Sequence, residues 1–375
     1  MWMSLPFEKC IQKVKTPFKL PKKEYLEQGR YPVVSQEAAL ISGYHDDANH
    51  LFNVGQPVVI FGDHTQVLKF IDFSFVMGAD GVKILKPIND IDAKYFYYAL
   101  TTLMPKGKGY ARHYKLLKEL NISFPPLAEQ QRIVAKLDAA FAEIDKAIDA
   151  VNEKERQCLA MLKTTLNAIV SCSLNCDEEK PLGEVAKFLD YRGRTPAKSE
   201  AGVRLLTAKN VRMGYIKQEP LEYVTDDTYQ QHMTRGLPRV GDVVITTEAP
   251  LGLVAQIENT DVALGQRLIT LQTAEEEIKN SYLKYLLMAE VTQQKIHAAG
   301  TGATVKGIKA SLLKKIPINF PKSLREQQKR ADTLEAITQQ GDSLLETLVK
   351  KCKELAQLKS AILAQELQPP QSEAA

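Results

Sequence analysis

The sequence predicts an α+β protein in which two α/β domains are joined by two long helices that form an antiparallel coiled coil, arranged as a pseudo-twofold internal repeat. Three observations support this fold class. A Phe-Pro segment at 124–132 returns at 320–329, a long charged segment with a helical apolar period follows each copy, and the segments before each copy also resemble one another. Agreement over about 45 residues indicates a duplication.

The spacing between the two copies is nearly constant. Phe124 and Phe320 are 196 residues apart. Further upstream, the segment 55–60 resembles 241–245 at an offset of 186, the difference between 241 and 55. A drifting offset indicates insertions within a shared fold, and insertions of this kind are expected in loops.

The first domain begins with short strands and ends with a helix. Its predicted strands are 31–35, 58–61 and 67–75. Segments 43–47 and 62–65 contain the glycine and polar residues typical of turns, and the second would close a hairpin. From Asp92 to Met104, apolar and aromatic residues recur at helical spacing, which predicts a helix packed on the sheet.

The second domain repeats this plan with different loop contents. Its predicted strands are 203–206, 243–247 and 253–257. Residues 300–307 form a glycine-rich segment that also carries hydroxyl and lysine side chains, and such a loop lets backbone N–H groups approach a phosphate closely. Because the segment does not match Gly-x-x-x-x-Gly-Lys-Ser/Thr, it does not predict a nucleotide-binding loop.

Each long helix carries an apolar seam with alternating spacings of three and four residues. The residues predicted at the helix-pair interface are Val134, Leu137, Phe141, Ile144, Ile148, Val151 and Leu162 in the first helix, and Leu334, Ile337, Leu348, Leu355 and Ile362 in the second. Leu344 and Leu358 also fall on the second seam, and the expected interruptions are Glu155, Thr165 and Gly341.

The length of these helices favours pairing. About 45 residues span roughly 65–70 Å, which is too long for a helix lying on one small domain. A narrow apolar face is also insufficient to bury a helix alone. The two helices are therefore expected to pair, and a pseudo-twofold relation makes the pair antiparallel. Two unrelated surface helices are the alternative.

Composition limits the classes of protein that the chain can belong to. Its 375 residues, 44% hydrophobic and 25% charged, suffice for two cores, and no apolar run is long enough to cross a bilayer. The N-terminus lacks signal-peptide features, so the expected location is the cytoplasm, without a membrane partner. The five cysteines form no Cys-x-x-Cys pair and no zinc-type Cys/His set, so reduced thiols and no metal site are predicted.

Positive charge is concentrated in the domains although the net charge is only +4. Residues 106–118 hold five Lys/Arg and no acid, 300–315 hold four lysines and no acid, and 187–212 hold seven basic residues against two acids. Solvated loops would explain any one cluster. Similar clusters in both copies favour a polyanionic partner, because Lys and Arg that face phosphates release counterions and gain affinity.

The repeated segments carry a resemblance to a known family. Phe-Pro-Pro-Leu-Ala-Glu-Gln-Gln-Arg-Ile at 124–133 and Phe-Pro-Lys-Ser-Leu-Arg-Glu-Gln-Gln-Lys at 320–329, in the order domain, helix, domain, helix, resemble the specificity subunit of type I restriction-modification systems. The resemblance covers nearly the whole chain. It implies target recognition domains at 1–124 and 175–320, spacer helices at 125–174 and 321–368, and a disordered tail at 369–375.

The resemblance also implies a function. The chain would be a sequence-specific DNA-binding subunit that reads a bipartite, asymmetric target in double-stranded DNA. Two methyltransferase subunits would dock on the helices, restriction or motor subunits would join the complex, and the helix pair would act as a ruler between two half-sites. The chain itself would be non-catalytic and without cofactors, since S-adenosylmethionine, ATP and Mg²⁺ would bind partner subunits. We find no methyltransferase, Walker or nuclease motif in the sequence.

Basic and polar residues of the domains are the DNA-contact candidates, since Arg and Asn suit base edges and Lys more often contacts phosphates. In the first domain they are Lys19, Lys22, Lys23, Tyr44, His64, Lys106, Lys108, Arg112 and His113. In the second domain they are Arg192, Arg194, Lys198, Lys209, Asn210, Arg212, Thr301, Thr304, Lys306 and Lys309.

Two functions of other classes stay open at this point. The chain would be a coiled-coil scaffold without a nucleic-acid role if the basic clusters serve only solubility. It would be a stand-alone DNA methyltransferase with degenerate motifs if the isolated chain bound S-adenosylmethionine.

Overall fold

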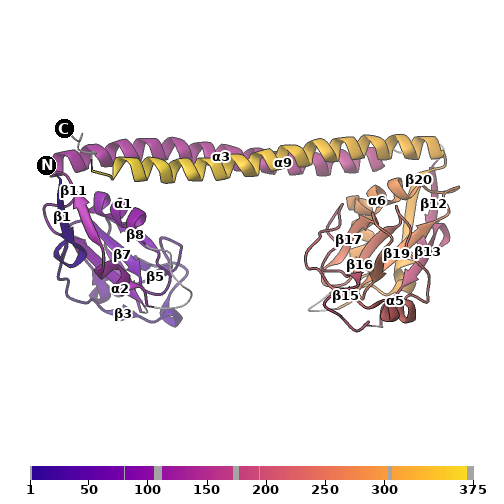
Figure 1. Cartoon of the computed structure of the whole chain (residues 1–375), viewed down its shortest axis with the longest axis horizontal. Helices are drawn as coiled ribbons and strands as arrows, with labels where there is room; N and C mark the ends of the chain where they lie inside the picture. The colour runs from indigo at the N-terminus through magenta and orange to yellow at the C-terminus, as the bar shows by residue number, and fades with distance from the viewer. Residues whose placement is uncertain are drawn as a thin grey trace. The chain divides into compact units, whose positions relative to one another are not determined.

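The structure is a computed structural model (Figure 1) that describes residues 2–79, 81–104, 112–171, 177–193, 195–302 and 306–369. The chain divides into two compact units. The first comprises Met1–Asn152 and Val349–Ala375, and the second comprises Glu153–Leu348. Each unit contains one α/β domain and a part of both long helices, α3 (Leu127–Ser171) and α9 (Leu324–Glu366).

The first unit contains two main sheets and a short two-stranded one. The order of the four-stranded sheet is β2 (Ile11–Gln12), β10 (Val82–Pro87), β7 (Val58–Gly62), β8 (Leu68–Ile71). The five-stranded sheet contains β3 (Lys19–Leu20), β9 (Phe75–Gly78), β4 (Tyr31–Val34) and β5 (Gly43–His45), with β6 (Leu51–Phe52) paired to β9. Strand β1 (Met3–Pro6) pairs with β11 (Asn121–Phe124). The helices are η1 (Phe7–Lys9), η2 (Lys22–Glu24), η3 (Ala48–His50), α1 (Ala93–Leu103) and α2 (Tyr114–Lys118).

The second unit contains the corresponding sheets. The order of its four-stranded sheet is β13 (Ala186–Asp190), β19 (Leu268–Thr273), β16 (Val243–Thr247), β17 (Leu251–Gln256). A three-stranded sheet contains β15 (Tyr223–Val224), β14 (Val203–Leu206) and β18 (Val262–Leu264), and β12 (Asp177–Pro181) pairs with β20 (Pro317–Pro321). The helices are α4 (Leu182–Val185), α5 (Asp226–His232), α6 (Asn280–Met288), α7 (Glu290–Ala299) and α8 (Ala310–Leu313).

Strand order confirms the predicted internal repeat. The sheet β2-β10-β7-β8 has the same topology as β13-β19-β16-β17, and the parallel pair β4–β9 corresponds to the parallel pair β14–β18. In each unit the first strand pairs antiparallel with the strand that leads into a long helix, as β1 with β11 and β12 with β20. The two domains therefore share one topology.

The predicted helix at 92–104 is confirmed as α1. Its N-cap is Asp92, whose carboxylate accepts hydrogen bonds from the backbone N–H groups of Lys94 and Tyr95. Tyr95 and Phe96 are fully buried. The aromatic face of α1 thus covers the four-stranded sheet, as its helical apolar spacing predicts.

Helices α3 and α9 pair antiparallel within each unit (Figure 1). In the first unit Lys136 Nζ lies 2.6 Å from Glu366 Oε1, and Lys359 Nζ lies 2.8 Å from Asp145 Oδ1. In the second unit Arg330 Nη1 donates to the Ile169 carbonyl at 3.2 Å. Because the partner's residue number in α9 falls as that in α3 rises, the predicted antiparallel pairing is confirmed.

Burial of the seam residues agrees with most of the predicted interface. The fully or almost fully buried ones are Leu137, Phe141, Ile144, Val151, Leu334, Leu348 and Leu355. The half-buried ones are Val134, Ile148, Leu162, Ile337 and Ile362. The predictions for Leu344 and Leu358 are wrong, because these side chains are 46% and 48% exposed. Leu363, which was not predicted, is buried, whereas its predicted neighbour Ile362 is only half-buried.

Gly341 does not interrupt the seam, contrary to the prediction. It is buried against α3, where a Cβ added at this position would lie 2.7 Å from both Cδ atoms of Leu162. The Cys158 thiol also lies 4.0 Å from the Gly341 carbonyl oxygen. The absent side chain therefore lets the two helices approach closely at this point.

Three of the predicted strand and turn boundaries are wrong. Residues 67–75 are not one strand, because Asp72–Ser74 carry the chain from β8 in one sheet to β9 in the other. Residues 43–47 are not simply a turn, because 43–45 pair with β4 and form β5. Strand β17 begins at Leu251, two residues earlier than predicted, because a register shift lets Leu251 pair with Thr247.

The long helices lie inside their predicted ranges of 125–174 and 321–368. The predicted tail at 369–375 lies outside the described residues except for Pro369. None of the described helices combines the length and the apolar character needed to cross a lipid bilayer.

Candidate nucleic-acid interface

A buried glutamine in each repeated segment fastens a long helix to its domain. Gln130 is fully buried, and its Oε1 accepts a hydrogen bond from the Asp92 N–H at 2.8 Å. Its Nε2 donates to the carbonyls of Asp90 and Pro125, both at 2.8 Å. Gln327 makes the same three bonds in the second unit, with the Lys279 N–H and the Glu277 and Pro321 carbonyls.

A second contact joins the same elements through a carboxylate. In the first unit Asp138 of α3 accepts from the Tyr98 hydroxyl at 2.5 Å and from Lys94 Nζ at 2.7 Å. The domain helix α1 is therefore fixed to α3 at its start and again two turns later.

The corresponding contact in the second unit uses a longer acid. Glu335 Oε2 accepts from the Tyr285 hydroxyl at 2.6 Å and from the nearly buried Lys284 Nζ at 2.9 Å. The hydrogen bond from Tyr285 is the main reason why the pKa of Glu335 is lowered. Burial raises the pKa of Tyr285, so this phenol stays protonated and continues to donate.

None of these fastening residues was predicted from the sequence. Tyr98 and Tyr285 occupy matching positions of the repeat, 187 residues apart, and Asp138 and Glu335 match at 197. An acid and a tyrosine that recur together in both copies are the signal that could have identified the contact.

In the first domain, Asp63 organises a surface that contains predicted DNA contacts. It lies in the turn between β7 and β8. Its carbonyl accepts from the His113 N–H at 2.8 Å, and its carboxylate accepts from the Tyr114 N–H at 2.8 Å. These bonds fix the residues just before α2. Arg112 is exposed there, whereas His113 is buried with its Nδ1 3.1 Å from the Asp63 carbonyl oxygen.

The second domain has a similar arrangement at the end of β16, next to its turn into β17. The Thr247 carbonyl accepts from the Ile308 N–H at 2.9 Å, directly before α8. Thr301 and Gly307 exchange backbone hydrogen bonds of 2.8 and 2.9 Å. The side chains of Thr301, Lys306 and Lys309 are exposed on this segment.

Arg192, two residues after β13, supports the same segment. Its Nη1 donates to the Ile308 carbonyl at 3.0 Å. Its Nε and Nη2 contact the two carboxylate oxygens of Asp190 at 2.8 and 2.6 Å, and this contact raises the pKa of Arg192. Because this half-buried guanidinium is paired with a carboxylate through two bonds, it fixes the position of the segment and adds little free positive charge to the surface.

A basic hollow of about 590 Å³ lies beside the same turn. Its lining includes Lys209, Arg212, Lys217 and Glu219 from the segment after β14, and Ala249 and Pro250 from the turn. The hollow thus joins the basic loop after β14 to the turn between β16 and β17.

Asn210 gives that basic loop its shape. The side chain is fully buried, its Oδ1 accepts from the Thr207 N–H at 3.1 Å, and its Nδ2 donates to the Pro220 carbonyl at 3.0 Å. Its amide is therefore engaged with the backbone on both sides of the loop. Arg212 remains half-buried, and its Nη1 donates to the Lys209 carbonyl at 2.9 Å.

Lys198 and Lys209 share one acidic partner. Glu222 Oε1 lies 2.8 Å from Lys198 Nζ and 3.3 Å from Lys209 Nζ. The hydrogen bond from Lys198 is the main reason why the pKa of Glu222 is lowered. One positive charge of this group of three is left uncompensated.

The other candidates of the first domain are spread over its surface. Lys19 lines a hollow of about 460 Å³ together with Lys13 and Lys83. Lys22 forms an ion pair with Glu37 at 2.5 Å, and Lys23 is exposed.

Two further candidates lie in turns or edge strands. Tyr44 is half-buried on β5, where its backbone exchanges two hydrogen bonds of 2.9 Å with Leu26. His64 lies in the Asp63 turn, and its N–H donates to Gln36 Oε1 at 3.3 Å. Lys106, Lys108, Arg194 and Thr304 lie outside the described residues.

These features define a class of protein. Two domains of one topology, each with a basic surface at the same turn and each fastened to paired helices, are typical of a protein that reads two adjacent sites on a polyanion. The chain matches the type I restriction modification DNA specificity domain over residues 10–153 and again over 177–353, and it belongs to this family. It is a specificity subunit that recognises DNA.

Individual relatives agree with this assignment. The chain is 22% identical over 357 residues to the type I restriction enzyme EcoR124I/EcoR124II specificity subunit of Escherichia coli, covering 90% of this chain and 86% of that protein. It is 18% identical to a chain in a solved structure that concerns complex assembly and conformational transition of the type I R-M system, with a TM-score of 0.75 and coverage of 98% and 97%. The HsdS subunit from Thermoanaerobacter tengcongensis is 19% identical, with a TM-score of 0.51 and coverage of 98% and 96%. The last two similarities confirm the fold.

Proposed function

We propose that this chain is the non-catalytic DNA-reading subunit of a type I restriction-modification complex, with each α/β domain reading one half of a bipartite, asymmetric target in double-stranded DNA. The observation that carries the proposal is the repeated surface formed by the first hairpin turn and the segment before α2 or α8. A similar backbone bond fixes each surface, from His113 to Asp63 in the first domain and from Ile308 to Thr247 in the second. The exposed side chains differ, so the two half-sites differ as well.

Exposure and pairing separate the candidate contacts into two groups. Arg112, Lys306 and Lys309 are exposed, and we assign them to direct contact with DNA. Asn210 and Arg192 already make several hydrogen bonds within the domain, and we assign them to holding the reading loops in shape.

We assign the docking of two methyltransferase subunits to the helix pair and the adjacent domain helices. A hollow of about 690 Å³ lies beside α1 in the first unit, lined by Tyr97, Phe141 and Leu363 among others. A hollow of about 610 Å³ lies beside α6 in the second unit, lined by Leu159 and Met288 among others. Two similar hollows in two similar units suit two copies of one partner.

We assign the remaining functions of the complex to other subunits. Restriction or motor subunits join the assembly, and the relative from Escherichia coli is named as part of a restriction enzyme. S-adenosylmethionine, ATP and Mg²⁺ bind the partner subunits, and this chain needs none of them to read DNA. The complex acts on DNA in the cytoplasm.

Charge reversal in the complex with its methyltransferase subunits tests the DNA surface. Arg112→Glu and Lys309→Glu each remove a positive charge that faces phosphate or base edges, so each should weaken target binding at least about tenfold and lower the slope of log K against log salt by about 1. Lys9→Glu and Lys322→Glu change exposed lysines outside the two surfaces and serve as matched controls. Equal effects of all four variants, or none, would overturn the assignment. Binding of S-adenosylmethionine by the isolated chain would overturn its non-catalytic role.

A further inference from the structure

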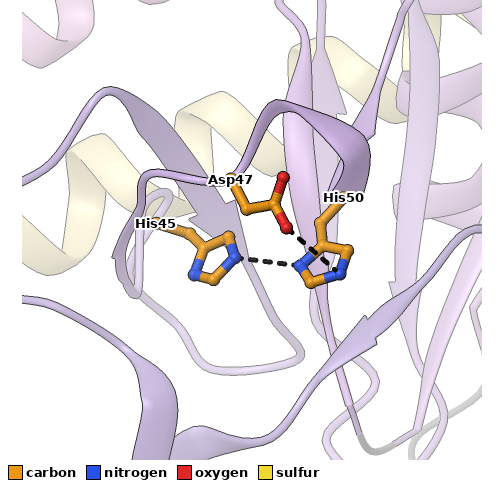
Figure 2. A group of neighbouring side chains, drawn as sticks. All are labelled: His45, Asp47 and His50. Atoms are coloured by element: carbon orange, nitrogen blue, oxygen red, sulfur yellow. Dashed lines mark hydrogen bonds and ion pairs between the residues drawn. The ribbon is translucent and has the colours of Figure 1, made fainter.

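Three metal-binding side chains meet in the first domain, between β5 and β6. Figure 2 shows His45 at the end of β5, His50 at the end of η3, and Asp47 between them on the connecting loop. His45 Nε2 and His50 Nδ1 are 2.9 Å apart, and Asp47 Oδ2 is 3.7 Å from His50 Nε2. One ligand atom from each of the three residues lies within 4.8 Å of the other two.

The surrounding contacts hold this cluster in place without using its ligand atoms. Asp47 Oδ1 accepts hydrogen bonds of 2.9 Å from both the backbone and side-chain nitrogens of Asn49, which leaves Oδ2 facing His50. Phe18 stacks on the His50 ring, with 3.6 Å between ring centroids and 8° between planes. The carboxylate and the second imidazole are thus preorganised by neighbours that compete for neither.

The two imidazoles present ring nitrogens to each other. His45 Nε2 and His50 Nδ1 are 2.9 Å apart, close to the separation of two ligand atoms on one tetrahedral metal ion. A divalent cation at this place can bind both nitrogens. Metal binding in proteins requires deprotonated ligands of this type.

The ligand set selects a class of metal. Two imidazoles and one carboxylate suit Zn²⁺ and other late first-row divalent ions, whereas Mg²⁺ and Ca²⁺ prefer oxygen ligands. Bonds of about 2.0–2.1 Å in a tetrahedral site place ligand atoms roughly 3.3 Å apart. The imidazoles would separate slightly and Asp47 would move inward, which its exposed position on the loop permits.

We propose that His45, Asp47 and His50 bind one Zn²⁺-like divalent ion, with water completing its coordination, and that the ion fixes the loop 46–50 onto β5. The expectation of no metal site considered only cysteine spacings and Cys/His sets. The spacing here is His-x-Asp-x-x-His, which becomes a site only because the loop after β5 brings His50 against His45.

Titration of the full-length chain tests the site. With thiols reduced and metals removed by chelation, Zn²⁺ calorimetry should give one saturable ion per chain, and Co²⁺ should give an absorption spectrum without a thiolate charge-transfer band. His45→Gln and His50→Gln should each weaken binding by more than about 100-fold, since loss of a ligand exceeds the usual effect of losing a supporting partner. His297→Gln, an exposed histidine of the second domain, is the matched control and should bind as the parent does.

The metal-free variants must first match the parent in thermal unfolding, which separates lost ligands from lost folding. Asp47→Asn supplies a second readout, since it keeps the bonds to Asn49 possible and should weaken binding without abolishing it. Absence of saturable Zn²⁺ binding to the parent, Zn²⁺ binding by the two histidine variants as tight as that of the parent, or a thiolate band in the Co²⁺ complex would each overturn the proposal.

Discussion

Gln130 and Gln327 illustrate how one side chain can fix the start of a long helix. Each amide pairs with three backbone groups. Two of these groups belong to the loop before α1 or α6, and the third precedes the long helix. The first glutamine of the repeated Glu-Gln-Gln therefore has a structural role in the joint between domain and helix.

Removing one of these amides should destabilise its unit. Gln130→Ala leaves the Asp92 N–H and two carbonyls unpaired, so the free energy of unfolding should fall by about 3 kcal/mol. Gln131→Ala, an exposed neighbour on the same helix turn, should change it by less than about 0.5 kcal/mol. Urea unfolding of the full chain measures both. Equal effects would show that Gln130 does not fasten the helix.

The Glu335 carboxylate gives a prediction about pH. Since the hydrogen bond from Tyr285 lowers its pKa below the ordinary value of 4.5, Glu335 stabilises the fold above that value and loses the contribution as the pH falls through the folded-state pKa. At neutral pH, Glu335→Gln should cost roughly 1–2 kcal/mol, less than for a fully buried ion pair because Glu335 is half exposed.

Unfolding at several pH values distinguishes this role from a general charge effect. Below pH 4.5 the difference between the parent and Glu335→Gln should shrink. The control Glu346→Gln changes an exposed acid of the same helix and should match the parent throughout. A difference that stays constant with pH would contradict the contribution assigned to the ionised carboxylate.

At the scale of elements, the contact of Gly341 with Leu162 sets the distance between the two helices. Alanine in place of a helical glycine usually stabilises by about 1 kcal/mol. Here its Cβ would clash with Leu162, so Gly341→Ala should lack that gain in the parent and show it in a Leu162→Ala background. A double-mutant cycle on unfolding free energies measures the coupling. The same gain in both backgrounds would exclude close contact at this point.

The long helices and several strands, among them β7, β14 and β16, were predictable from the sequence, whereas the pairing of the strands into sheets was not. An apolar repeat of 3.5 residues that continues over some 45 residues indicates a helix paired with another helix. The strands β2, β3, β6 and β15 have only two residues each, too few to show a period. The apolar run from 67 to 75 likewise gives no sign that the chain changes sheet at Asp72.

The candidate site was predictable in composition and not in geometry. Basic residues around Arg112 and Lys309 are visible in the sequence, and both are exposed in the structure. The burial of Asn210 depends on backbone groups up to ten residues away, and the meeting of His45 with His50 depends on how their loop folds. Such contacts are set by tertiary structure, which residue type and spacing do not determine.

At the scale of the whole molecule, α3 and α9 each continue through both units, so the proposed ruler acts through their length. Inserting one heptad in each helix, beside Cys158 and Gly341, preserves the seam and adds roughly 10 Å. The spacer of the recognised target should then grow by about three base pairs with both half-sites kept. Sequencing of the methylated motif measures this, and altered half-sites with an unchanged spacer would refute the ruler.

The most direct test of the central claim is the methylated motif of cells that co-express the chain with its methyltransferase subunits. The parent should yield two different half-sites at one spacing. Arg112→Gln should relax base preference in one half-site, and Lys309→Gln should change recognition in the other half-site alone. If either substitution altered both half-sites, or if neither altered any, the assignment of one half-site to each domain would be contradicted.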